Sequence, residues 1–344
     1  MADSQTKDTS TPGEKDVTPE QQALRDEAQD TFKRVQFALQ MRHPDQGLRM
    51  LQPLLKKLDA QSQSAPDNDP MAFDFSNPEQ AYLYFNLNPK TDPDALHPTV
   101  APYTDAYGIH SALLYTLGDY EGAVAAINKA LQFNPTDAGL YLERAMSHEA
   151  MFDFDTVQQD IEDAYPIITR AIDLARYHAF RANVLIAQGK YDLAAAHYAV
   201  YEDFDPDDVY ANPHEELHEL GHRTGHGHAY AHLTSADAAK RLQRARENYG
   251  PSDLAVSTLQ QILNDSINLR HPEDARAAAQ SLWDVTHFDG WKTLIEKFDE
   301  LARMTPDERK AAASKAAADE ADTAPAPDSP ADTSDNKKES DSDD

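Results

Sequence analysis

Apolar residues recur at helical spacing through the middle of the chain, and short polar turns interrupt them at regular intervals. Gly118-Asp119-Tyr120 is echoed by Phe152-Asp153-Phe154 and again by Gly189-Lys190-Tyr191. These turns are separated by 34 and 37 residues. A pair of short helices cannot bury its apolar face alone, so this period predicts helical hairpins that stack on their neighbours.

The same pattern predicts the positions of the helices. Pairs are expected at 104–117 with 120–133, 138–151 with 154–166, and 174–188 with 191–203. Further helices are expected at 209–223, 235–249, 252–269, 272–285 and 289–303. No window alternates with period two for long enough to predict a strand. The sequence therefore predicts an all-α fold.

The N-terminal part carries a second type of turn. Thr18-Pro19-Glu20-Gln21 predicts a helix start, with a hydroxyl cap, a proline in the first turn and a glutamine three residues on. A helix to about Met41 and another from 45 to 58, bent at Pro53, follow. Arg42-His43-Pro44 lies between them, and Arg270-His271-Pro272 repeats it far downstream. We interpret both as turns of degenerate repeats.

Composition changes along the chain and divides it into segments. Residues 1–17 are expected to be disordered, 18–60 to form an N-terminal helical pair, and 61–76 to form a linker. Residues 77–303 are expected to form the array, with a short helix from 77 and an irregular loop at 87–103. The tail, 304–344, is alanine-rich and then acidic, and is expected to be disordered.

Residues 104–137 resemble the tetratricopeptide repeat. The resemblance rests on Tyr107 in the first helix, the turn at Gly118-Asp119-Tyr120, the small residues Ala123 and Ala130, and the closing Pro135. It is equally strong in 175–208 and weaker in 138–171, where Phe152 replaces the turn glycine. The degenerate repeats and capping helices of 209–303 would complete the array. The resemblance implies a right-handed superhelix whose first helices line a concave groove that binds a peptide or protein.

Seven residues are expected in this groove: Tyr115, Glu143, Met146, Glu149, Arg176, Phe180 and Asn183. Aromatic, methionine and arginine side chains are enriched at binding hot spots. The alternative is that Tyr115, Met146 and Phe180 belong to the core between repeats, because groove and core positions are one helical step apart.

One subtype of the family clamps the C-terminal carboxylate of heat-shock chaperones with basic and amide side chains. The corresponding positions here hold Gly108, Ile109, Ala112, Leu142 and Ala179, and only Asn183 fits. Binding of chaperone tails is therefore not supported.

A histidine-rich segment at 214–232 carries the alternative chemistry. His218-Glu219-Leu220-Gly221-His222, extended by Gly225 and His228, matches the zinc-binding pattern of metzincin peptidases, in which Glu219 would activate a metal-bound water. No sheet is predicted upstream, and the one later methionine, Met304, ends a helix. Histidines also recur here every four residues, so a solvated polar helix face explains the match more simply.

Composition excludes several function classes. The formal net charge is −29, with 60 acidic and 31 basic residues, which disfavours nucleic acid and anionic membranes. The chain has no cysteine, no secretory leader and no apolar run of membrane-spanning length, which favours the cytoplasm. We therefore expect a cytoplasmic, non-catalytic protein-interaction or scaffold module without cofactor or metal. The alternative is a zinc-dependent metallopeptidase using His218, Glu219, His222 and His228.

Overall fold

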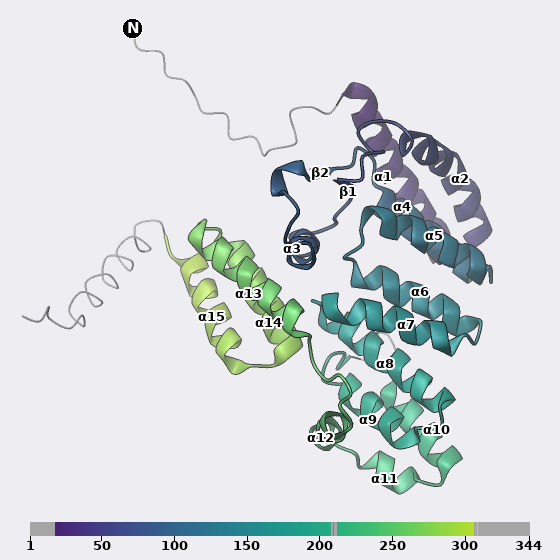
Figure 1. Ribbon diagram of the computed structural model, residues 1–344, viewed down its shortest axis with the longest axis vertical. Helices are drawn as coiled ribbons and strands as arrows, with labels where there is room; N and C mark the ends of the chain where they lie inside the picture. Colours follow the sequence, from purple (N-terminus) through teal and green to yellow (C-terminus); the bar gives the residue numbers. More distant parts are fainter. Residues whose placement is uncertain (1–17, 208, 210–211, 306–307, 309–344) are drawn as a thin grey trace, which may run out of the picture. The chain divides into compact units, whose positions relative to one another are not determined.

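The structure is 74% helical and has almost no strand (Figure 1). The computed structural model describes residues 18–207, 209, 212–305 and 308. Residues 1–17, which are predicted to be disordered, lie outside the described residues. The same holds for the predicted disordered tail, 304–344, except for residues 304, 305 and 308. The expected all-α class is confirmed.

Ten of the described helices form five hairpins whose two members pack against each other. The hairpins are α1 (Pro19–Gln40) with α2 (Pro44–Gln61), α4 (Tyr103–Thr116) with α5 (Tyr120–Phe133), α6 (Ala138–Ala150) with α7 (Phe154–Ala164), α8 (Ala171–Ala187) with α9 (Tyr191–Tyr201), and α13 (Asp253–Asn268) with α14 (Pro272–Thr286). The remaining helices are α3 (Pro78–Leu87), α10 (Pro213–Thr224), α11 (Gly227–Ala231), α12 (Ser235–Ala245) and α15 (Asp289–Arg303).

The five hairpins share one turn conformation. The second residue after each first helix is left-handed, with φ of 60° at Arg42, 81° at Gly118, 61° at Phe152, 73° at Gly189 and 62° at Arg270. The next amide donates to a carbonyl five residues back at 2.8–3.0 Å. A left-handed residue other than glycine costs about 1–2 kcal/mol, so hairpin packing must impose this turn where glycine is absent. The two Arg-His-Pro sequences thus occupy the turns predicted for them.

Side-chain caps explain where several helices begin. At Thr18 the predicted capping box is confirmed: its hydroxyl accepts from the Gln21 amide at 3.2 Å, and the Gln21 side chain accepts from the Thr18 amide at 2.8 Å. Asp119 accepts from the Gly122 amide at 2.9 Å and Asp153 from the Thr156 amide at 3.2 Å. Such caps satisfy amides that have no partner within their helix.

Much of the core of the described residues lies in three clusters of buried apolar side chains. One joins α1, α2, α4 and α5, the second joins α6, α7 and α8, and the third joins α8 and α9 with α10 and α12. Helix α8 contributes to two clusters. Displacement of α8 would therefore disturb packing on both of its sides.

Hairpin α13–α14 packs mainly on elements much earlier in the chain. It contacts α3, the 3₁₀ turn η2 (Tyr165–Ile167) and α8. The Tyr82 hydroxyl donates to Asp265 at 2.9 Å and the Asn86 amide donates to Thr258 at 2.8 Å. The periodicity of residues 209–303 contains no signal for these contacts, because they join residues more than 170 positions apart.

A short parallel strand pair corrects the expectation of no strand. β1 (Ala72–Phe73) pairs with β2 (His97–Pro98) inside the expected linker and irregular loop, close to the 3₁₀ turn η1 (Pro93–Ala95). Two residues are too few to create a period-two pattern. The pair is positioned by aromatic packing, because the Phe73 ring lies 4.5 Å from the Tyr84 ring and 5.1 Å from the Phe75 ring.

The chain divides into two compact units, residues 1–295 and 296–344. All features described below lie in the first unit. The described part of the second unit comprises the end of α15 and a local contact in which the Thr305 amide donates to Glu308 at 2.8 Å.

Candidate functional site

The seven expected groove residues lie on the first helices of three successive hairpins. Tyr115 is on α4, Glu143, Met146 and Glu149 are on α6, and Arg176, Phe180 and Asn183 are on α8. The residues on α6 are three apart, and those on α8 are four and three apart, so the members on each helix lie on one side of it. All are half-buried except Phe180, which is 1% exposed.

The middle of this face belongs to the core. Phe180 is part of the α6–α7–α8 cluster and Met146 packs against that cluster. Phe180 and Met146 therefore pack as the alternative interpretation expects, in the core between repeats. Tyr115 instead lies with its ring 5.2 Å from that of Tyr120 in the same hairpin. Polar groups available to a partner are consequently at the two ends of the face.

At one end, hydrogen bonds join three helices. The Asn183 amide of α8 donates to Glu149 of α6 at 2.8 Å, and the Tyr198 hydroxyl of α9 donates to the amide oxygen of Asn183. Burial raises the pKa of Glu149, the Asn183 hydrogen bond opposes this rise, and the charge of Glu216 on α10 adds to it. A positively charged group next to Glu149 would stabilise its ionised form and lower its pKa.

At the other end, a polar cavity of about 240 Å³ opens among the N-termini of α3, α6 and α8. Arg170 donates to Asp173 at 2.7 Å, and Arg176 lies 3.4 Å from the same carboxylate. Asp137 caps α6 by accepting from the Gly139 amide at 2.9 Å. The other lining residues are Ser76, Asn77, Gln80, Thr136, Ala138, Ile167 and Thr169.

Charge around this cavity is unbalanced. Asp137, Glu143 and Asp173 provide three carboxylates, whereas Arg170 and Arg176 provide two guanidinium groups. Burial raises the pKa of Glu143 and of Asp137, and neither shift is removed by the arginines. Buried carboxylates are stable when paired, so the described arrangement favours one additional cation.

The sequence did not identify Asp137, Arg170 or Asp173 as site residues. Asp137 has the signature of a helix cap, being followed at once by an apolar helix, and that signal could have placed it near the groove end. Arg170 precedes a helix that starts at Ala171, three residues before its predicted start. No local pattern predicts that three helix N-termini meet here.

The histidine-rich segment forms α10 and α11. Leu217, Leu220 and Gly221 face the core, whereas the histidines at 214, 218, 222, 226 and 228 are exposed. His214 lies 2.7 Å from the Glu202 carboxylate. Within the described residues, no three His, Asp or Glu side chains are grouped to hold a metal ion. The histidines named here thus lie on the solvent-exposed side of this segment, opposite its buried apolar residues.

Gly221 permits a close crossing of α10 and α11. A Cβ on Gly221 would lie 2.7 Å from the Gly227 Cα, closer than real contacts allow, whereas a Cβ on Gly227 would meet nothing nearer than 3.9 Å. Gly225 ends α10 with φ of 76°. Gly221 and Gly225, which lie within the metzincin-like stretch, thus have structural roles in this chain.

We expect Gly221→Ala to lower the free energy of unfolding by about 1–3 kcal/mol, because the methyl group forces α11 away from α10. Alanine is the better helix former by about 1 kcal/mol, so without this crossing the substitution would be stabilising. Urea unfolding followed by circular dichroism measures the change. Gly227→Ala is the matched control and should be nearly neutral. A stabilised Gly221→Ala would contradict the crossing.

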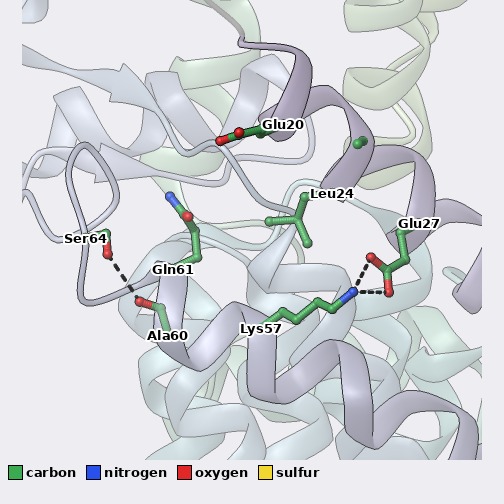
Figure 2. Close-up of a pocket in the computed structure, with 8 residues that line it drawn as sticks. Glu20, Leu24, Glu27, Lys57, Ala60, Gln61 and Ser64 are labelled. Atoms are coloured by element: carbon green, nitrogen blue, oxygen red, sulfur yellow. Dashed lines mark hydrogen bonds and ion pairs between the residues drawn. The ribbon is translucent and has the colours of Figure 1, made fainter.

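An open hollow of about 520 Å³ lies between α1 and α2. Figure 2 shows Lys57 directed at Glu27, with Leu24 and Gln61 on the adjoining wall. The Lys57 ammonium is 2.7 Å from Glu27, but both side chains are about half exposed, at 55% and 40%. Exposed pairs of this kind contribute little to stability. The hollow shares no residue with the hydrogen bonds that join Glu149, Asn183 and Tyr198 or with the polar cavity described above.

Comparison with protein-family models and with curated proteins finds no match for this chain. Among the helices of the described residues, none is long and apolar enough to span a bilayer.

Proposed function

We propose that this chain is a tetratricopeptide-like solenoid and a non-catalytic interaction module, whose groove binds a peptide segment bearing a positively charged side chain. The repeated turn supports the solenoid, because five hairpins separated in sequence have the same left-handed residue and the same closing hydrogen bond. Stacking of such units creates an extended concave surface.

The observation that carries the proposal is the charge imbalance on the first helices. Glu143 and Glu149 lie six residues apart on α6, and burial raises the pKa of both. A lysine or arginine of a bound peptide would supply the missing positive charge at either end of the face. Close charge pairs across some protein interfaces have coupling energies of about 1.5–7 kcal/mol.

A display library of random dodecapeptides, panned against the full chain, tests this function. The enriched peptides should contain lysine or arginine, and their affinity for Glu143→Gln and Glu149→Gln should fall at least tenfold, as measured by isothermal titration calorimetry. Truncating one partner of a buried charge pair typically costs 2–5 kcal/mol in binding.

Glu162→Gln provides the matched control, because it removes the same charge from the exposed face of the second helix α7. Its affinity for the same peptides should be unchanged. An equal loss of affinity in all three variants would show that binding depends on the net charge of the chain and not on Glu143 or Glu149. Enrichment of acidic or uncharged peptides would contradict the proposed partner.

A further inference from the structure

Two histidines are in direct contact inside the core between α8 and α9. His178 and His197 are each 0% exposed, and their Nδ1 atoms are 2.8 Å apart. One ring must donate its Nδ1 proton and the other must accept it, so at least one ring of the pair is neutral. The Nε2 atom of each ring has no hydrogen-bond partner among the described residues.

The surroundings of the pair offer little compensation for a second proton. His178 stacks on Phe204 with ring centroids 5.6 Å apart, and the Tyr177 ring stands edge-on to it at 5.4 Å. The Nε2 of His197 lies 3.7 Å from Glu247, which is itself engaged by Arg181. Further titratable groups beside these neighbours are Tyr165 next to Tyr177, His287 next to Phe204, and Glu162 near Arg181.

The pair lies in the same two helices as the hydrogen bond between Tyr198 and Asn183. His197 is next to Tyr198 in α9, and His178 is five residues before Asn183 in α8. The Tyr198 hydroxyl holds Asn183, which in turn holds Glu149. A shift of α9 away from α8 would separate Tyr198 from Asn183 and change the end of the groove.

We infer that the His178–His197 pair is an acid-sensitive joint, which opens the α8–α9 hairpin on proton uptake and so weakens binding in the groove. This regulation rests on the proposed function. The doubly protonated pair cannot persist in the closed hairpin, because two N–H groups would then face each other across the 2.8 Å contact.

The direction of the pH dependence follows from burial. Burial lowers the pKa of His178 well below its usual value, and the charge of His197 lowers it further. Burial also lowers the pKa of His197, an effect that Glu247 opposes. Below about pH 6.5 the histidine takes up a proton in the open state but not in the folded state, because its pKa is lower when folded. The stability of the folded state is therefore full above about pH 6.5 and is lost as the pH falls. For one such histidine, the opening constant should rise about tenfold between pH 7.5 and pH 5.5.

A buried carboxyl acts in the opposite direction. Burial raises the pKa of Asp74 to about 6, so its contribution to stability increases as the pH falls through that range. Glu247 acts in a lower window, because His197 and Arg181 hold its pKa at about 2 and its contribution is lost only below about pH 4.5. The contribution of the histidine pair to the pH dependence is therefore obtained by comparing variants with and without the pair.

Hydrogen exchange of the α8 and α9 amides at pH 7.5 and 5.5, corrected for the intrinsic rate, measures the opening constant. The increase in the unaltered full chain should be about tenfold larger than in His178→Gln or His197→Gln, since a neutral amide keeps a hydrogen bond but cannot titrate. His232→Gln, at an exposed position, should behave as the unaltered chain does. Equal increases in all four proteins would overturn the joint.

Imidazole resonances of the unaltered chain give a second readout that does not depend on the variants folding. At least two of the 14 histidines, His178 and His197, should remain neutral at pH 6. Titration of all of them near pH 6.5 would overturn the inference. Failure of the selected peptides to bind at pH 7.5 would instead overturn the proposed function, and the exchange result would be unaffected.

Discussion

Arg181→Ala is expected to lower the free energy of unfolding by about 3–5 kcal/mol. The Arg181 guanidinium donates to both carboxylate oxygens of Glu247, at 2.8 Å and 2.9 Å, and the two side chains are only 13% and 15% exposed. The pair joins α8 to the segment after α12 across 66 positions. Removing the arginine leaves a carboxylate that is largely withdrawn from water and next to neutral His197.

Urea unfolding at neutral pH measures this loss. Arg223→Ala is the control, because Arg223 is 3.9 Å from Glu219 and both side chains are more than half exposed, at 52% and 64%. Exposed pairs contribute about 0–1 kcal/mol, so the control should change little. Equal stability of the two variants would show that the Arg181–Glu247 pair does not join these elements in solution.

Leu142→Ala is expected to lower the free energy of unfolding by about 2–5 kcal/mol. Leu142 is 0% exposed and lies in the cluster that α6 forms with Val157 and Ile161 of α7. Truncation removes apolar contacts and leaves a cavity, because helices on both sides restrict collapse. Since α8 shares this cluster, the loss should also appear as faster amide exchange in α8.

Leu269→Ala is the matched control, since Leu269 follows α13 and is 66% exposed. A surface substitution of this kind should change stability by no more than about 0.5 kcal/mol. Calorimetric or urea unfolding of the two variants in parallel gives the comparison. A loss below 1 kcal/mol in Leu142→Ala would contradict the packing of the α6–α7 hairpin.

The sequence predicts the helical hairpins well, because their signals are local. Gly118 and Gly189 are the residues that a left-handed turn favours, and Thr18 with Gln21 forms the expected capping box. Phe152 and Arg42 adopt the same turn without a glycine. Their turns could be predicted only by comparison with the other repeats. The order of the helices and turns can therefore be predicted mainly from the repeat spacing and the positions of the turns.

The remaining features depend on contacts between residues far apart in sequence. The Arg181–Glu247 pair and the packing of Tyr82 on Asp265 leave no trace in any short window. For Phe180, groove and core positions differ by one helical step, which periodicity does not resolve. The His178–His197 contact joins two residues in apolar helix faces, where a single histidine suggests nothing beyond an ordinary core position.

The most direct test of the groove is the footprint of a bound peptide. Hydrogen exchange of the full chain, measured with and without a lysine-containing peptide from the display selection, locates the contact. Slower exchange in α6 and α8, the first helices that carry Glu143, Glu149 and Asn183, is the expected result. Protection confined to α5 and α7, or to the histidine-rich helices α10 and α11, would contradict a binding groove on the first helices.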